Sequence, residues 1–197
     1  MTETFLTMVP MRDLIYFSKI GRYRDNALSR HRMIQSIYPS EIGDGSRKKL
    51  NLLYRFEKDF QGGRALIRSS VAPASLSQIK TITEKHEYKH NDNVGFRVVI
   101  NPIKRNGSKE SFLTKTEDIE EYVEKRFFEA LKDIHVVSMS SETLWRTNLR
   151  SNKNFLKLVQ IDAVATVDEE DKFLNFIKNG VGRNKNYGAG LITARKI

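Results

Sequence analysis

The sequence holds four histidines, whose imidazole side chains suit proton transfer because their unperturbed pKa is about 6.5. One of them, His31, lies in residues 25–38, a segment that predicts a helix. It shares the inward-facing stripe of that helix with Ala27, Ile34 and Tyr38. From these residues alone, the favoured interpretation of His31 is a histidine at the edge of the core, satisfied by a backbone carbonyl.

Residues 86–90 spell H-E-x-x-H, the signature of zinc proteases. In those enzymes the motif lies on a substantial helix, and a third ligand reaches the metal. Here the neighbouring residues are polar and charged and no metzincin continuation follows, which favours a solvated loop between domains. The fourth histidine, His135, precedes a Val-Val strand and is interpreted as structural. The sequence therefore predicts no metal and no cofactor.

A second candidate site is the glycine-rich stretch at residues 179–196, whose centre is basic and rich in amides. Its members are Gly180, Gly182, Arg183, Asn184, Lys185, Asn186, Tyr187, Gly188 and Gly190. Glycine lets backbone N–H groups approach a phosphate closely. The spacing fits neither a nucleotide P-loop nor a dinucleotide fingerprint. An anion-binding loop and an ordinary glycine-rich hairpin are the two interpretations.

Composition favours a polyanionic partner. The 197 residues carry a formal net charge of +10 and no cysteine, which excludes disulfides and thiolate metal sites and indicates a reducing compartment. We expect no signal peptide and no membrane-spanning segment, so the expected location is the cytoplasm. A membrane surface would require a basic amphipathic helix, but the clearest helical pattern has an acidic polar face. Nucleic acid is the favoured partner.

The elements that must position these residues follow one order twice. In the first half, strands at 5–10, 50–56 and 64–70 surround the helix at 25–38, with Asp25 or Asn26 as its cap, and a weaker helix is expected within residues 72–82. The second half predicts strands at 95–102, 135–139, 143–148, 155–166 and 191–193, with helices from 114 to about 131 and at 168–179. Thr114 and Glu117 have the spacing of a capping box.

This order predicts an α+β fold of tandem ferredoxin-like (RRM-like) β-α-β-β-α-β domains. The expected domains are residues 1–85, which carry His31, and residues 94–197, which carry the glycine-rich stretch. The polar residues between them mark the boundary.

With the elements in this order, the chain resembles the CasE family of CRISPR-associated endoribonucleases. Residues 180–192 match the family's glycine loop, G-I-G-x-x-K-x-F/Y-G-x-G-L-L. Further stretches fit in the same order, at residues 25–31, 52–55, 66–70 with Pro73 following, 96–102 and 163–168. The resemblance covers nearly the whole chain and departs from the family at Leu28, where a tyrosine is usual, and at Ala163, where a glycine is usual.

The resemblance implies metal-independent cleavage of the repeat hairpin of precursor CRISPR RNA. The ribose 2′-OH attacks the adjacent phosphate and leaves a 2′,3′-cyclic phosphate, and the enzyme keeps the mature guide RNA as a subunit of the CRISPR surveillance complex. His31 matches the family's catalytic histidine. Because Leu28 replaces the tyrosine, the second proton-transfer group stays open among Tyr23, Ser29 and a lysine of the glycine loop, Lys185.

The candidate RNA-binding residues are cations together with the glycine loop. A predicted hairpin tip at residues 148–154 suits the phosphates of an A-form stem, whose deep groove hides the bases from side chains. The candidates are Arg22, Arg24, Lys104, Arg105, Arg146, Arg150, Lys153, Gly180, Gly182, Arg183, Asn184, Lys185, Tyr187 and Gly188. For any single cation a solvated turn is the alternative.

Two other functions stay open from the sequence. A non-catalytic RNA-hairpin-binding module of the same fold would keep the charge and the loop, and Leu28 in place of tyrosine favours it. A zinc hydrolase would use residues 86–90.

Overall fold

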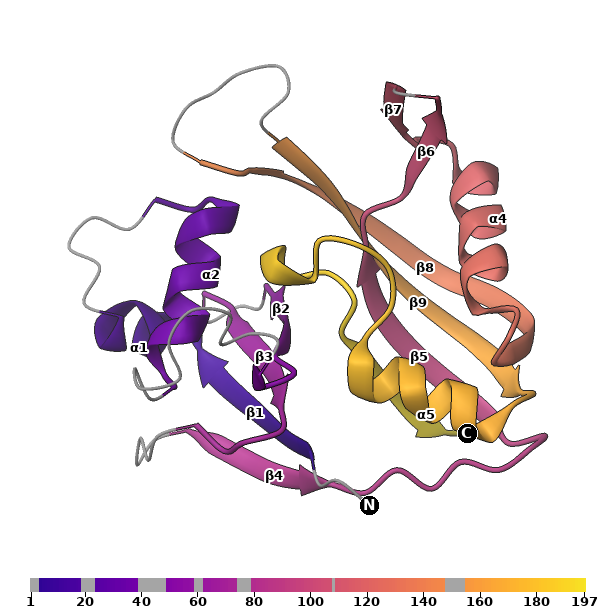
Figure 1. Cartoon of the computed structure of the whole chain (residues 1–197), viewed down its shortest axis with the longest axis horizontal. Helices are drawn as coiled ribbons and strands as arrows, with labels where there is room; N and C mark the ends of the chain where they lie inside the picture. The colour runs from indigo at the N-terminus through magenta and orange to yellow at the C-terminus, as the bar shows by residue number, and fades with distance from the viewer. Residues whose placement is uncertain are drawn as a thin grey trace.

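The computed structural model describes residues 4–18, 24–38, 49–58, 62–73, 79–107, 109–147 and 155–197. These residues form two four-stranded antiparallel sheets that lie side by side, with helices packed on them (Figure 1). No helix among them is long and apolar enough to cross a membrane.

The first sheet has the strand order β2-β3-β1-β4. Its strands are β1 Thr4–Pro10, β2 Leu53–Glu57, β3 Arg64–Ser69 and β4 Lys80–Glu84. Two helices, α1 Met11–Phe17 and α2 Ala27–Ser36, connect β1 to β2 and cover one face. The core beneath them includes Leu14, Met33, Ile34, Tyr38 and Ile67.

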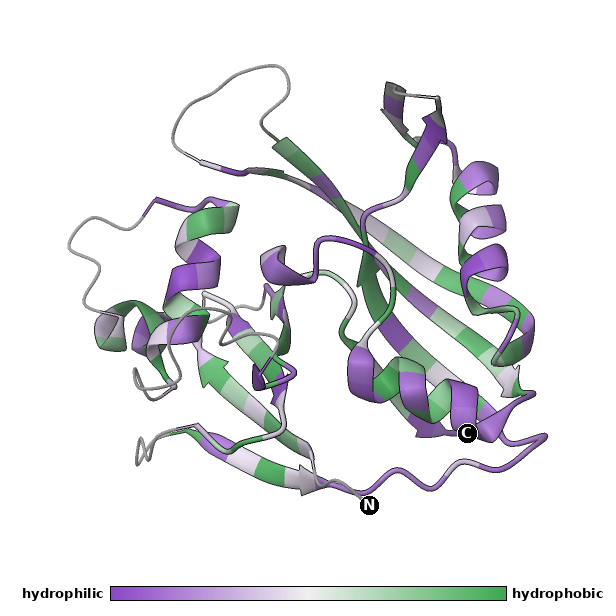
Figure 2. Ribbon diagram, viewed as in Figure 1, coloured by the Kyte–Doolittle hydropathy of each residue, from purple (hydrophilic) through white to green (hydrophobic). Residues whose placement is uncertain are grey.

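The second sheet has the order β10-β5-β9-β8. Read from its β8 end, this order repeats that of the first sheet, strand for strand. Its strands are β5 Asn93–Ile100, β8 Leu131–Trp145, β9 Phe155–Val167 and β10 Ile192–Lys196. Helices α4 Thr116–Phe127 and α5 Glu170–Asn179 pack on it with their apolar sides inward (Figure 2). In each sheet the third strand in sequence lies between the first and the second, and the fourth lies on the other side of the first. This arrangement is the ferredoxin-like topology. The predicted fold class is confirmed.

Several expected elements differ in the structure. The helix predicted within residues 72–82 is wrong for its last residues, which begin β4; Thr81 and Thr83 are β-branched, and β4 pairs with β1. Residues 74–78 lie outside the described part of the chain. The two strands expected at 135–139 and 143–148 are one long strand, β8.

The prediction of a capping box at Thr114 and Glu117 is also wrong. The N-cap position of α4 is occupied by Lys115, and no side chain caps the helix. Helix α4 ends at Phe127, earlier than expected. The first-half cap is confirmed as Asn26, whose side chain accepts a hydrogen bond from the Ser29 N–H at 2.9 Å.

Two short elements were not expected from the pattern. Helix α1 follows β1 directly, and a hairpin of β6 Ile103–Asn106 and β7 Lys109–Phe112 stands between β5 and α4. The hairpin extends beyond the end of the second sheet, close to the end of the β8–β9 pair (Figure 1). It brings Arg105 to the candidate site.

The two sheets are joined by contacts between residues far apart in sequence. Ala27 packs into an apolar cluster of the second domain with Leu144, Leu156 and Ala189. The backbone N–H of Leu28 donates to the carbonyl of Arg146 at 3.1 Å. The start of α2 is thereby fixed against the end of β8, which sets where His31 lies.

Candidate nucleic-acid interface

His31 lies where the two domains meet. It projects from α2 and is half-buried. Its ring centroid is 6.4 Å from that of Tyr187 in the glycine loop, in an edge-on arrangement, and 6.5 Å from that of Tyr54 in β2, nearly parallel. The structure therefore brings His31 together with Tyr187, a residue 156 positions later in the sequence. Tyr54 was missed by sequence reasoning, although it lies in a stretch, residues 52–55, that carried the family resemblance.

The glycine loop rests on the first domain. It contains a short 3₁₀ turn, η2 Lys185–Tyr187, which contacts α2 and β2. The hydroxyl of Tyr54 donates to the carbonyl of Asn186, and Gly188 lies against the Tyr54 ring, where an added Cβ would meet ring carbon Cε2 at 3.4 Å. The loop thus belongs to the second domain in sequence and to both domains in packing.

The glycines of the loop have different structural roles. A Cβ added at Gly180 would lie 2.7 Å from the carbonyl oxygen of Gly190 and from Leu53, and one at Gly190 would lie 2.6 Å from the carbonyl oxygen of Val181. These two glycines allow the chain segments to cross closely. Gly182 has a φ of +76° and no heavy atom within 4 Å of an added Cβ. Among the glycines predicted to bind RNA, Gly182 alone has open space beside its Cα.

Lys185 is bound within the loop. Its Nζ donates to the carbonyl oxygens of Asn179 at 2.7 Å and Gly180 at 2.9 Å. A role in proton transfer would require the ammonium to leave both acceptors. Asn184 has a left-handed φ of 60°, and its carbonyl accepts from the Tyr187 N–H at 2.8 Å. Both residues shape the loop that carries Tyr187.

Two predicted arginines pair with one carboxylate, and the charge of a third acts on it. Glu110 in β7 accepts from Arg105 Nε at 2.7 Å and lies 3.4 Å from Arg183 Nη1. The pKa of Glu110 lies below its usual value, first because of the hydrogen bond from Arg105, with further contributions from the charges of Arg183 and Arg146. We call Arg105, Arg146 and Arg183 the arginine cluster. Its members come from β6, the end of β8 and the glycine loop, so the fold assembles a site that the sequence shows only as separate basic residues.

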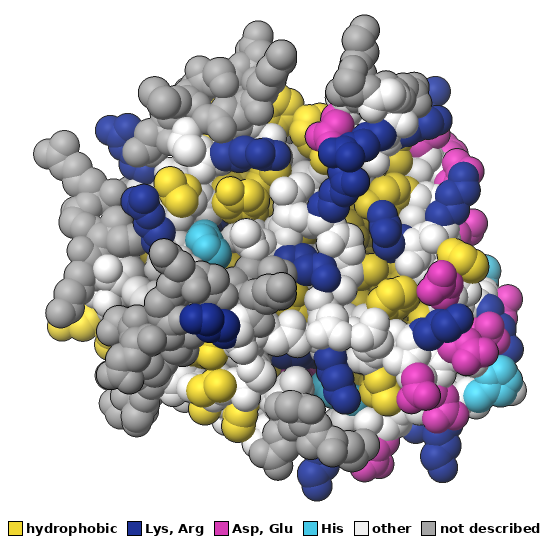
Figure 3. Space-filling model, in the orientation of Figure 1, with side chains coloured by type: hydrophobic (Ala, Val, Ile, Leu, Met, Phe, Trp, Pro, Cys, Tyr) yellow, Lys and Arg dark blue, Asp and Glu magenta, His cyan; other side chains and the backbone are white. Residues whose placement is uncertain are grey.

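The remaining predicted cations are placed separately or not at all. Lys104 is exposed on β6, and its charge acts on Glu121 of α4. Arg24 is exposed just before α2. The predicted site residues Arg22, Tyr23, Arg150 and Lys153 lie outside the described residues. Figure 3 shows Lys and Arg side chains spread over the upper and central parts of the visible face, whereas Asp and Glu gather along one edge.

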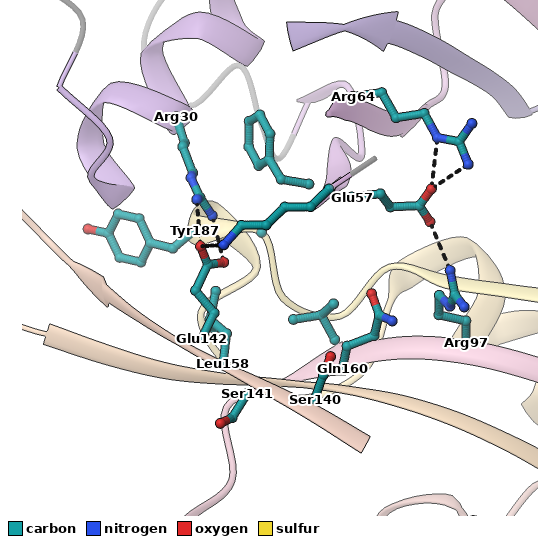
Figure 4. Close-up of a pocket in the computed structure, with 14 residues that line it drawn as sticks. Arg30, Glu57, Arg64, Arg97, Ser140, Ser141, Glu142, Leu158, Gln160 and Tyr187 are labelled. Atoms are coloured by element: carbon teal, nitrogen blue, oxygen red, sulfur yellow. Dashed lines mark hydrogen bonds and ion pairs between the residues drawn. The ribbon is translucent and has the colours of Figure 1, made fainter. Parts of the chain in front are cut away.

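A cavity of about 470 Å³ lies between the domains, beside Tyr187 and Gly188 of the glycine loop (Figure 4). It is lined by residues of both sheets and by Tyr187, and His31 is not among them. Within it Arg30 donates to Asp25 at 2.7 Å and to Glu142 of β8 at 2.8 Å. Burial opposes the charge of Arg30, but these hydrogen bonds outweigh burial and raise its pKa. Arg30 therefore locks α2 to β8, a role that the sequence did not reveal.

The H-E-x-x-H stretch does not form the helix that zinc proteases need. Residues 85–92 run between β4 and β5 without helical structure. His86 Nε2 lies 3.6 Å from Glu84, while His90 Nδ1 lies 2.7 Å from the carbonyl oxygen of Asp168. The two imidazoles thus contact different elements instead of sharing one helix face. No group of three or more potential ligands for a metal occurs in the described ranges.

Comparison with known proteins agrees with this fold. A family model described as CRISPR associated protein matches residues 17–196. The structure is similar to that of Cas6e from Escherichia coli, with a TM-score of 0.70 at 17% identity, covering 99% of this chain and 100% of that one. It is also similar to Thermus thermophilus Cse3 bound to an RNA representing a pre-cleavage complex, with a TM-score of 0.73 at 18% identity, covering 98% and 99% of the two chains.

A third similar chain belongs to a CRISPR RNA-guided surveillance complex, with a TM-score of 0.65 at 19% identity and coverage of 98% and 100%. No curated protein matches the chain in sequence. At these identities the structural similarities establish the shared fold, and the family rests on the sequence model.

Proposed function

The chain belongs to the CRISPR associated protein family, and we propose that it is an endoribonuclease that cleaves the repeat hairpin of precursor CRISPR RNA. The similar structures include a CRISPR endoribonuclease, Cse3, bound to RNA. In the proposed reaction the 2′-OH of the ribose attacks the adjacent phosphate without a metal and leaves a 2′,3′-cyclic phosphate. The protein keeps the mature guide RNA as a subunit of a surveillance complex in the cytoplasm, a proposal that the similarity to a chain of such a complex supports.

The observation that carries this proposal is the position of His31 beside the glycine loop. An imidazole can take the 2′-OH proton or protonate the leaving 5′-oxygen, provided that RNA lies within hydrogen-bond reach. The start of α2 is bonded to the backbone of Arg146, and the charge of Arg146 acts on Glu110 together with those of Arg105 and Arg183. A strand whose phosphates contact the arginine cluster would therefore pass the same end of the domain interface as His31. Cations of this kind also stabilise negative charge that develops on a phosphate.

We propose that the second proton-transfer group is one of Tyr23, Ser29 and Lys185. Tyr23 precedes α2 in the sequence and keeps its predicted role. Lys185, which donates to two loop carbonyls, supports catalysis by holding the glycine loop and contributes to proton transfer only if RNA displaces those carbonyls. We further propose that residues 1–85 and 94–197 are the two domains, because the strands of the first sheet end at Glu84 and those of the second begin at Asn93.

The test is cleavage of a labelled repeat hairpin in EDTA by the wild type and by His31→Ala. We expect His31→Ala to bind the hairpin with unchanged affinity and to lose cleavage, by roughly 10²- to 10⁴-fold as for the removal of a general acid or base. His135→Ala is the matched control, since His135 is exposed on β8 next to Glu120 and Glu124 of α4. Cleavage by His31→Ala at the wild-type rate would remove His31 from the mechanism.

A second candidate function is RNA retention without cleavage. Leu28 stands where the resemblance expects a tyrosine, and a leucine side chain has no proton to transfer. This function predicts tight, salt-dependent binding of the hairpin by the wild type and no cyclic-phosphate product.

A further inference from the structure

Three aromatic side chains meet beyond the end of the second sheet. Trp145 ends β8 and pairs directly with Phe155, which begins β9. The ring centroid of Phe155 lies 6.0 Å from that of Trp145, edge-on, and 5.2 Å from that of Phe112 at the end of β7, nearly parallel. We call these three residues the aromatic cluster. Each of the three residues is only partly buried.

The aromatic cluster is flanked by cations. Phe112 lies two residues after Glu110, the carboxylate on which the arginine cluster converges. Arg146 follows Trp145 directly, and Arg105 lies on the strand that pairs with β7. The guanidinium groups of Arg105 and Arg183 pair with a single carboxylate, and the charge of Arg146 acts on it as well, which leaves an excess of positive charge beside the rings. Figure 3 shows hydrophobic side chains next to Lys and Arg side chains in this upper part of the face.

This combination matches the chemistry of an unpaired nucleotide. Aromatic rings stack on bases of any sequence, and guanidinium groups bind the adjoining phosphates. Bases within an A-form stem are already stacked and paired, so only a nucleotide outside the stem can offer a free ring face.

The aromatic cluster is also tied to the proposed catalytic residue. The Arg146 carbonyl accepts the N–H of Leu28 at 3.1 Å, and His31 lies three residues after Leu28 on α2. The residue next to Trp145 and the first turn of the His31 helix are therefore fixed to each other. A nucleotide stacked on the cluster belongs to the part of the RNA near the cleaved bond.

We propose that the aromatic cluster is a binding site for the base of an unpaired nucleotide that flanks the hairpin stem, with the arginine cluster holding its phosphates. This inference rests on the proposed function, because it takes repeat RNA as the ligand. The alternative role of the three rings is only to hold the β6–β7 hairpin against the β8–β9 pair.

Trp145 is the single tryptophan of the chain, so intrinsic fluorescence reports directly on this site. The titration uses a hairpin with its natural flanking nucleotides and a 2′-deoxy substitution at the cleaved position, which blocks the nucleophile. A parallel set replaces each unpaired nucleotide in turn by an abasic one. We expect the full RNA to quench Trp145, and one or two of the abasic RNAs to bind without quenching it.

Two outcomes overturn the inference while leaving the proposed function intact. One is tight RNA binding, measured by filter retention, with no change in Trp145 emission. The other is equal quenching by every abasic RNA. Failure of the wild type to bind any hairpin would instead overturn the proposed function, and this inference with it.

Variants separate base stacking from support of the hairpin. Trp145→Leu keeps an apolar contact for Phe155 and removes the indole plane. We expect it to weaken binding of the full RNA by about 5- to 100-fold and to leave binding of the critical abasic RNA unchanged. Trp145→Phe should recover most of the loss. Phe128→Leu, at an aromatic residue 66% exposed beside the end of α4, is the control. Equal weakening of both RNAs by Trp145→Leu would show a purely structural role.

Discussion

Arginine side chains gather in two regions of the molecule that differ in burial. At the domain interface, Arg30 and Arg68 are 5% and 1% exposed. On the surface, the side chains of Arg105 and Arg183 are 57% and 54% exposed and share one carboxylate, Glu110. A buried charge must be paired, whereas an exposed pair contributes little to stability. The buried arginines therefore hold the domains together, and the exposed ones remain available to phosphates.

Replacing Arg68 tests the buried region and should have the largest effect on stability. Arg68 donates to Glu84 through Nη2 at 2.7 Å and to the carbonyls of Ile177 and Ile192 of the second domain, each at 2.7 Å. Arg68→Met leaves the buried carboxylate of Glu84 without its guanidinium partner and with the weaker contacts of Thr4 Oγ1 at 3.4 Å and His86 Nε2 at 3.6 Å. We expect a loss of about 3–5 kcal/mol in the free energy of unfolding, measured with denaturant.

The exposed counterpart is Arg105→Met. It should leave the unfolding midpoint unchanged, and similar losses for the two variants would erase the distinction between the regions.

The second-largest expected effect is a loss of stability in acid, through Glu84 of the buried region. Burial alone would raise the pKa of Glu84, but hydrogen bonds from Arg68 and His86, together with the charges of those two side chains, lower it to about 2, from an ordinary value of 4.5. The unfolded chain therefore takes up this proton at higher pH than the folded one. The stability contributed by the Glu84 charge is complete above about pH 4.5 and is lost as the pH falls toward about 2. Unfolding free energies over this range should fall more steeply for the wild type than for Glu84→Gln; parallel curves would contradict the assignment.

The arginine cluster should affect RNA binding instead of stability. We expect Arg105→Ala, Arg146→Ala and Arg183→Ala each to weaken hairpin binding and to reduce the slope of log affinity against log salt by about 1, the effect of one lost phosphate contact. Arg126→Ala is the matched control, because Arg126 lies over the Tyr122 ring in the last turn of α4, at the opposite end of that helix from the β6–β7 hairpin. An unchanged slope in all three variants would place the RNA elsewhere.

Glu110→Gln should have the smallest effect and the opposite sign. Glu110 pairs with the arginines that are proposed to bind RNA phosphates. Its neutralisation should therefore raise hairpin affinity by a few-fold at low salt, with the gain fading as salt screens the charges. Titration at two salt concentrations measures this. A fall in affinity would mean that Glu110 orients the arginines for RNA instead of competing with it.

The order of elements could be predicted because periodicity is local. Met33 and Ile34 occupy the core side of α2, and Ile119 and Val123 that of α4, whereas Tyr38 reaches the same core from just beyond the end of α2. Helix α1 and the β6–β7 hairpin were missed because each is short, and a few residues carry too little periodicity to identify an element. The start of strand β4 was assigned to a helix because its neighbour in the sheet, β1, which favours a strand there, is distant in sequence.

The candidate site was predictable only in part, for a related reason. His31 and the glycine loop belong to recognisable stretches, but Tyr54 reaches Asn186 across 132 positions and Arg30 reaches Glu142 across 112. Glu110 looks like any solvated acid in the sequence, and its role depends on three arginines from different segments. Such pairings depend on how the two sheets are placed against each other.

The seating of the glycine loop on β2 has a mechanical consequence. The Tyr54 hydroxyl of the first domain donates to the carbonyl of Asn186. The Gly190 N–H donates to the carbonyl of Val99, in the second domain, at 2.7 Å. The loop is thus hydrogen-bonded to both domains. We therefore expect the His31 imidazole and Tyr187 to keep their mutual alignment when a bulky ligand binds.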